Sequence, residues 1–158
     1  MLLLIALLLG VGGGALAARQ YAWLRGFDSR GQPFNLQQLR GQVVLLTFAS
    51  KNTRDEATDV NEQLVEKASP GQVSVVSVVD LENVPAYGHG VARKKISEAD
   101  QPGLHHIVDD SGALRRSFRV DPRKQVDIFV IGRDGAVLGH FVGESGAQKA
   151  LELVDSLR

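Results

Sequence analysis

The sequence predicts an α/β sandwich in which helices pack on a mixed sheet of four or five strands. Two short apolar runs, residues 43–48 and 73–79, flank a helical pattern, and this order requires a parallel strand pair with a right-handed crossover. Residues 126–131 and 136–142 flank the turn Asp134-Gly135, which is typical of an antiparallel hairpin. A final helix must then cover one face of the sheet.

The composition excludes several classes of function. The chain has 158 residues with 18 basic and 18 acidic side chains, so its formal net charge is zero and nothing suggests a nucleic-acid partner. It contains no cysteine. Thiol-based oxidoreductase or peroxidase activity, zinc–thiolate sites and iron–sulfur clusters are therefore excluded.

The first 18 residues are expected to form a hydrophobic helix that is separate from the domain. Residues 2–18 are uncharged. They are interpreted either as a signal peptide, with Ala15-Leu16-Ala17 as its cleavage pattern, or as a membrane anchor at the lower length limit of a spanning helix. Both interpretations predict a periplasmic or extracytoplasmic location, with membrane contact if the segment is not cleaved. A linker is expected over residues 19–30, and the folded domain over residues 31–158.

The remaining helices are predicted from caps and apolar periodicity. Residues 53–68 are expected to form a helix that starts with a capping box of Thr53 and Glu56. Weaker patterns predict a helix over residues 91–99, a strand over 104–108 and a short helix over 113–118. Ser145 is expected to cap the last helix, with Gln148 completing a second capping box.

Two stretches resemble a known family. The sequence FNLQQLRGQVVL at residues 34–45 is similar to the entry segment of periplasmic thioredoxin-like proteins of the TlpA and peroxiredoxin type. The sequence FVIGRDG at residues 129–135 resembles their late hairpin. The resemblance extends over about residues 27–158 and implies a thioredoxin-like fold.

The same resemblance implies that the redox centre has been lost. Members of the family carry Ala-Ser-Trp-Cys-x-x-Cys after the first buried strand, whereas residues 49–55 read ASKNTRD here. Asn52 and Asp55 stand at the two cysteine positions, and Val126 stands at the position of the family's cis-proline. A cis bond before a residue other than proline costs about 3–4 kcal/mol, so a trans bond is expected at Val126.

Three stretches are closer to YtfJ-type periplasmic proteins, thioredoxin-like proteins that also lack the redox pair. They are residues 49–56, residues 78–88 and the IVD-x-x-G pattern at residues 107–112. Because no activity is established for that family, the resemblance implies compartment and fold. The expected function is a redox-inactive binding or assembly module of the cell envelope, with another envelope protein as partner and without a cofactor.

The strongest candidate site is the group Lys51, Asn52, Thr53 and Arg54. It lies where a strand leads into a helix at the carboxyl edge of a parallel sheet, where free N–H groups and two cations favour an anion or a partner's carboxylate. This predicts the alternative function, a small-ligand or anion-binding protein or a cysteine-independent enzyme. Ordinary capping beside two solvated cations is the competing interpretation.

Other polar residues are interpreted structurally. His105 and His106 are neighbours in a predicted strand and face opposite sides, so they cannot ligate one ion, and no metal site is expected. Asp109 and Asp110 belong to a turn rather than to an acid–base pair. Asp127 needs a partner if it is buried, or lies exposed at a strand start. Five basic residues around the predicted short helix are expected to form a solvated face: Arg115, Arg116, Arg119, Arg123 and Lys124.

Overall fold

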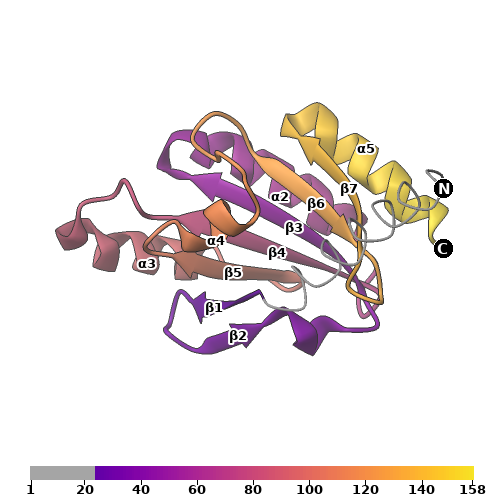
Figure 1. Cartoon of the computed structure of the whole chain (residues 1–158), viewed down its shortest axis with the longest axis horizontal. Helices are drawn as coiled ribbons and strands as arrows, with labels where there is room; N and C mark the ends of the chain where they lie inside the picture. The colour runs from indigo at the N-terminus through magenta and orange to yellow at the C-terminus, as the bar shows by residue number, and fades with distance from the viewer. Residues whose placement is uncertain (1–23) are drawn as a thin grey trace, which may run out of the picture.

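The computed structural model describes residues 24–158, so the predicted signal peptide or anchor at 1–18 and the start of the linker lie outside the described residues. Seven strands form one sheet in the order β2-β1-β5-β4-β3-β6-β7 (Figure 1). Strands β3, β4 and β5 are parallel, and the other pairs are antiparallel. The strands are β1 Arg25–Asp28, β2 Pro33–Asn35, β3 Val43–Ser50, β4 Val73–Asp80, β5 Leu104–Asp109, β6 Asp127–Ile131 and β7 Val137–Val142.

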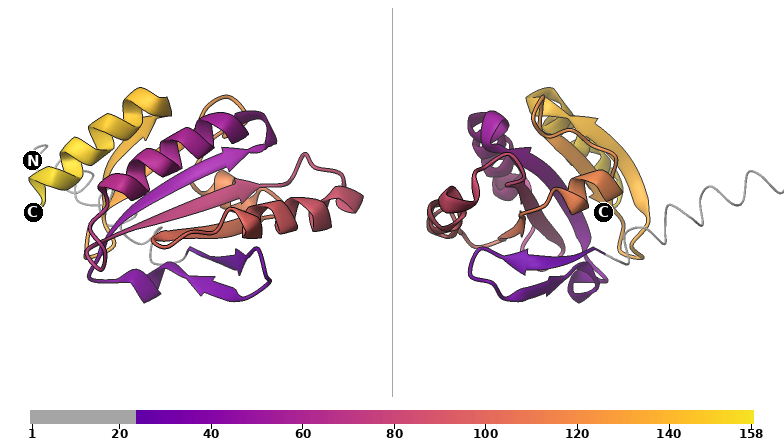
Figure 2. Two further views of the ribbon diagram at one scale, coloured as in Figure 1. Left: turned by 180° about the vertical axis from the view of Figure 1, so that it is seen from behind. Right: turned by 60° about the vertical axis from the view of Figure 1, so that its left-hand side comes forward.

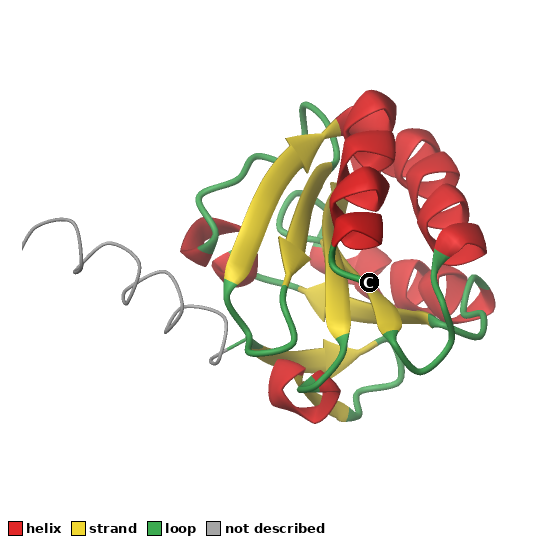
Figure 3. Ribbon diagram, turned by 90° about the vertical axis from the view of Figure 1, so that its right-hand side faces the viewer, coloured by secondary structure: helices red, strands yellow, loops and turns green. Residues whose placement is uncertain are grey.

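Helices lie on both faces of this sheet. Helices α2 and α5 pack against one face, and α3 stands on the same side (Figure 2). The short helix α4 lies on the opposite face (Figure 3). The helices are η1 Leu36–Leu39, η2 Lys51–Thr53, α2 Arg54–Lys67, η3 Ala86–Gly88, α3 His89–Glu98, α4 Ala113–Ser117 and α5 Gly143–Ser156. Within residues 24–158, no helix has the length and apolar content that a membrane crossing needs.

The sheet separates two hydrophobic cores. One core joins alternate residues of β3 and β4 to Val60 and Leu64 of α2 and to Ala147 of α5. The other lies on the opposite face, where Phe48 meets Phe118. Because both faces are covered, every residue of β3 is buried. The uninterrupted apolar run at residues 43–48 is therefore confirmed as a strand buried on both faces.

The sheet is wider than the four or five strands predicted. The prediction of a linker over residues 19–30 was wrong for Arg25–Asp28, which form β1 and pair with β5 through Phe27 and Val108. This strand has four residues and no apolar run, so its sequence shows no strand pattern. A Cβ at Gly26 would lie 2.7 Å from Ile107 Cγ2, so glycine allows β1 to approach the core.

Both predicted capping boxes were wrong. The observed box joins Ser50 and Thr53 at η2, one turn earlier than predicted, and Thr53 makes no side-chain cap to α2. Glu56 accepts a hydrogen bond from the Val126 N–H at 3.0 Å instead of capping its own helix. Helix α5 already begins at Gly143, so Ser145 lies inside it. At the start of α2, a partner far along the chain competes successfully with local capping.

Candidate functional site

A cavity of about 760 Å³ lies between α2 and α3. Ligand sites usually have volumes of about 300–1,000 Å³, so this cavity has the size of a binding site. Its floor is the sheet surface of β3, β4 and β5, and its lining is mainly apolar. The floor includes Ala49, Ser77, Val79, Leu104 and His106.

The cavity exists because α3 does not pack on the sheet. None of the residues of α3 is buried, and its apolar positions Val91, Ala92 and Ile96 line the cavity. Polar contacts hold the helix in place: Arg93 pairs with Asp110. Such contacts fix the position of a helix without requiring its apolar face to be covered.

The junction of η3 and α3 is also held by polar contacts. His89 Nε2 donates to the Val84 carbonyl at 2.8 Å, and His89 Nδ1 lies 3.4 Å from Asp110 Oδ1. Tyr87 of η3 lies at the mouth of the cavity and is 90% exposed. The mouth therefore presents an aromatic ring to solvent.

The polar groups in the floor are already hydrogen-bonded to one another. Thr47 Oγ1 donates to Asn61 Oδ1 at 3.0 Å, and Asn61 Nδ2 donates to Ser77 Oγ at 3.1 Å. All three side chains are buried. A bound molecule therefore needs no hydrogen-bonding groups to satisfy this part of the floor.

His106 is the titratable group in the floor. Its Nδ1 lies 2.9 Å from Asp100 Oδ1, and Asp100 also contacts Arg30 at 3.4 Å. His105 is exposed, which confirms that the two neighbouring histidines face opposite sides of β5. Within residues 24–158, no three His, Asp or Glu side chains are grouped as a metal site requires.

The four predicted binding residues take different positions. Lys51 and Arg54 line the cavity, and Asn52 is exposed. Thr53 is buried, and its hydroxyl donates to the Pro122 carbonyl at 2.7 Å and accepts the Ser50 N–H at 3.0 Å. A ligand at this edge therefore meets the two cations rather than Thr53.

The start of α2 adds little attraction for an anion. Its first turn carries Asp55 and Glu56, so two negative charges already lie at the positive end of the helix. Positive charge at the mouth therefore comes from the side chains of Lys51 and Arg54, and not from the helix terminus on which the sequence argument relied.

The three positions at which the family resemblance places a redox centre lie near this edge. Asn52 and Asp55 are exposed around the start of α2, and Val126 is buried at the start of β6. The peptide bond before Val126 is trans. Its N–H donates to Glu56 Oε2, a contact that proline cannot make because it lacks the N–H. Sequence analysis missed this role of Glu56 because the two residues are far apart in the chain.

The two carboxylates of the turn after β5, Asp109 and Asp110, have structural roles. Asp109 Oδ2 accepts the N–H groups of Leu114 and Arg115, at 2.9 and 3.1 Å, and thereby caps α4. Burial raises the pKa of Asp109, partly offset by these hydrogen bonds. Asp110 faces α3 instead, so the two carboxylates act separately. These contacts agree with the turn interpretation and not with an acid–base pair.

The basic residues near α4 are not a simple solvated face. Arg115 Nε lies 3.0 Å from Asp80 Oδ2, and Arg115 also contacts Glu82. Arg123 pairs with Asp121 at 2.6 Å and lowers the pKa of that carboxyl to about 2. The expectation of a solvated face was wrong for Arg115, whose side chain is largely buried beside Asp80 and Glu82. Arg116 and Arg123 are exposed, but each has an acidic partner.

Asp127 is buried at the start of β6 and does have a partner. His140 of β7 places Nε2 2.8 Å from Asp127 Oδ1. The His140 ring also stacks on Phe129, with ring centroids 4.3 Å apart. Burial raises the pKa of Asp127, and the hydrogen bond from His140 opposes that shift without cancelling it.

We expect Asp127→Asn to stabilise the domain at neutral pH. A carboxyl with a raised pKa in the folded state stabilises that state when protonated, and this contribution is lost as the pH rises through the raised pKa. The stability gain of the variant over the natural chain should therefore grow from about pH 3 to pH 7. Denaturant unfolding at several pH values measures it. An equal change for Asp59→Asn, an exposed carboxylate on α2, would contradict the explanation.

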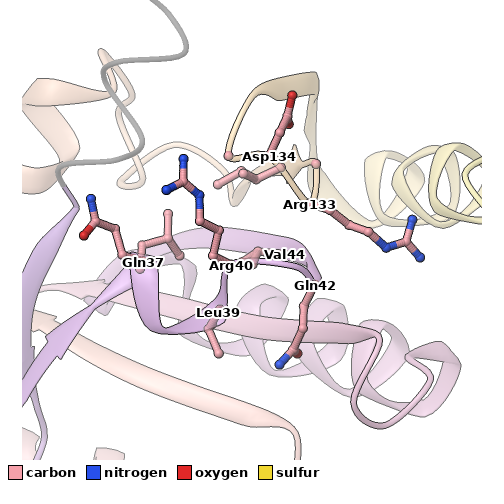
Figure 4. A pocket seen from close by; sticks show the side chains of 11 residues that line it. Gln37, Leu39, Arg40, Gln42, Val44, Arg133 and Asp134 are labelled. Carbon is pink, nitrogen blue, oxygen red and sulfur yellow. The ribbon is translucent and has the colours of Figure 1, made fainter.

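A second hollow, of about 30 Å³, lies between η1 and the turn after β6. Arg40 and Arg133 line it, but their side chains point in different directions (Figure 4). A space of this size holds no ligand much larger than water. The cavity between α2 and α3 is therefore the stronger candidate site.

Comparison with protein-family models and with curated proteins gave no match. Solved structures do match. The exposed lipoprotein thioredoxin Etrx1 of Streptococcus pneumoniae is 17% identical, with a TM-score of 0.61, over 82% of this chain and 98% of that one. A secreted Mycobacterium tuberculosis disulfide oxidoreductase is 16% identical, with a TM-score of 0.59, over 87% and 95% of the two chains.

A third match is BsSco, a member of the Sco family of cytochrome c oxidase assembly proteins. It is 18% identical, with a TM-score of 0.59, over 84% of this chain and 90% of that one. Together with the mixed sheet, these matches show an α/β domain with a thioredoxin-like architecture. The chain has a thioredoxin-like fold, as its sequence resemblance implied. The closer resemblance to YtfJ-type proteins stays a prediction.

If Asn52 and Asp55 occupy the old cysteine positions, Asn52→Cys with Asp55→Cys should form an intramolecular disulfide under mild oxidation. Both side chains are exposed, so little loss of stability is expected. The bridge should not restore full oxidoreductase activity, since the same alignment places Val126 at the position of the family's proline. Thiol titration and mass spectrometry measure the result. Two free thiols, or dimers alone, would contradict the alignment; Asn52→Cys with Asp59→Cys is the control.

Proposed function

We propose that this chain is an extracytoplasmic binding module that retains a thioredoxin-like fold without thiol chemistry. The observation that carries this proposal is the cavity of about 760 Å³ beside Lys51 and Arg54. A fold does not define a function, whereas a preformed apolar cavity with a few polar groups is a common form of binding site. The partner bound there is a component of the cell envelope.

Two observations support the location. Residues 2–18 are an uncharged apolar run of the kind found in signal peptides and anchors. Two structural neighbours are described as an exposed lipoprotein and as a secreted protein. In this proposal residues 1–18 direct export, as a cleaved signal or as a retained anchor, and residues 31–158 with β1 form the binding domain.

The absence of cysteine supports a role in binding rather than in electron transfer. The family described for BsSco supports an assembly role as one that this fold performs elsewhere. Enzyme activity without cysteine is the second candidate from the sequence. No observation favours it, since the hydroxyls of Ser50 and Thr53 both donate to the Pro122 carbonyl and His106 contacts Asp100.

Photo-crosslinking tests the proposal in the full chain. A photoreactive amino acid at Tyr87, at the mouth of the cavity, should form adducts in envelope preparations of the producing cell. The additional change Ala92→Trp fills the cavity and should remove these adducts. The matched control places the probe at Phe27, which is 57% exposed and does not line the cavity.

Mass spectrometry identifies the adducts, whether protein or small molecule. Adducts at Tyr87 that persist after Ala92→Trp, or adducts equally abundant at Phe27, would overturn the cavity as the binding site. Reduction of insulin by the purified chain, above the background of buffer, would overturn the loss of thiol chemistry.

A further inference from the structure

We propose that the cavity between α2 and α3 binds an amphiphile with one apolar chain and an anionic head. The head lies at Lys51 and Arg54, and the apolar chain extends between the two helices. The inference rests on the proposed function, because it names the ligand class of the same cavity. Charge, wall chemistry and the absence of a free strand edge each contribute to the argument.

Charge at the cavity is positive and not neutralised. Three cations line it, Lys51, Arg54 and Lys95, against one carboxylate, Glu62. The ion pairs found within residues 24–158 involve none of these four side chains. Arg93, Arg115 and Arg123 have acidic partners, whereas these three cations remain available to an anionic group.

The walls are complementary to an apolar chain. Helix α3 directs Ala92 and Ile96 to the cavity and buries no residue, although a surface helix normally covers its apolar stripe. Val79 and Leu104 form apolar parts of the floor opposite. A chain placed between them would remove both surfaces from water, which stabilises the complex in proportion to the apolar area covered.

The floor disfavours a peptide in the same place. A bound peptide must satisfy its own backbone N–H and C=O groups. Strands β3 and β4 pair on both sides, and β5 pairs with β4 along its whole length, so the backbone beneath the cavity offers no free edge. Asn61 and Ser77 are already bonded to each other. An alkyl chain has no such requirement, so it suits this floor better than a polypeptide does.

Displacement of a fluorescent long-chain carboxylate from the full chain tests the inference. Hexadecanoate and an acyl lysophosphatidate share the proposed chemistry, and their relative affinities distinguish a free fatty acid from a lipid headgroup as the source. Hexadecanol lacks the charge and should bind at least about tenfold more weakly, because it forms no charged hydrogen bond. Butyrate lacks the chain and should not compete.

Variants assign the binding to the cavity. Lys51→Glu with Arg54→Glu should weaken hexadecanoate at least about tenfold and leave hexadecanol unchanged. Lys124→Glu with Lys149→Glu is the control, since neither residue lines the cavity. Ala92→Trp should abolish binding of both probes, whereas Lys94→Trp, on α3 but outside the lining, should not. Both variants leave residues 2–18 unchanged. A loss of binding confined to Ala92→Trp therefore assigns the binding to the cavity and not to the apolar run at those residues.

Thr58→Trp blocks the cavity from an exposed position on α2 and provides a second test if Ala92→Trp does not fold. Equal affinities for hexadecanoate and hexadecanol, both lost in the blocked variants, would overturn the anionic head while the cavity remained a binding site. Amphiphile binding unchanged in both blocked variants would overturn the inference altogether. The crosslinks from Tyr87 then decide the proposed function independently.

Discussion

Replacing Phe48 by alanine is expected to lower the free energy of unfolding by about 3–5 kcal/mol. Phe48 is fully buried in β3, and its ring centroid lies 4.9 Å from that of Phe118 and 6.0 Å from that of Phe129. The substitution leaves a cavity at the centre of this aromatic cluster. The loss is a large part of the total stability of a typical domain, about 5–15 kcal/mol. Equilibrium denaturation measures it.

The matched control is Phe27→Ala in β1 of the same sheet. Phe27 is 57% exposed, so its removal should change stability by no more than about 0.5 kcal/mol. If the two substitutions cost the same, Phe48 would not be the centre of the core on this face of the sheet.

Replacing Arg115 by methionine is expected to cost about 3–5 kcal/mol of stability, because it leaves a buried charge without a partner. The side chain of Asp80 is 2% exposed, and its Oδ2 lies 3.0 Å from Arg115 Nε. Methionine preserves much of the length of the arginine but not its charge. The effect is measured by the same denaturation experiment at neutral pH.

The second change Asp80→Asn should recover most of that loss, since the double variant no longer buries an unpaired charge. Arg123→Met is the exposed control; its side chain is 45% exposed and its ion pair with Asp121 lies at the surface. It should cost at most about 1 kcal/mol. A loss for Arg115→Met no greater than that for Arg123→Met would contradict the importance of the buried pair.

Much of the central fold follows from sequence pattern. An apolar run that is buried on both faces, as in β3, has no polar position and is therefore recognisable without any structure. The helix α2 has its apolar stripe at helical spacing, and the last hairpin has Asp134-Gly135 in its turn. The loss of thiol chemistry needs only the absence of cysteine.

The candidate site was predicted in part. Lys51 and Arg54 do line the cavity, at the edge where a strand leads into a helix. Thr53 faces inward, because Pro122, far along the chain, accepts its hydroxyl. Nothing in the local sequence distinguishes a threonine that caps a helix from one that bonds a distant carbonyl.

Periodicity by itself determined the mixed α/β architecture and the strands at its centre, because these depend on residues close together in the chain. Composition by itself excluded thiol chemistry, because the whole chain has no cysteine. Only the tertiary structure decided that β1 extends the sheet, that Glu56 bonds Val126, and that α3 stands away from the sheet over a cavity. These features depend on distances between segments remote in sequence. A helix with an apolar stripe has the same pattern whether that stripe packs on a sheet or faces an open cavity.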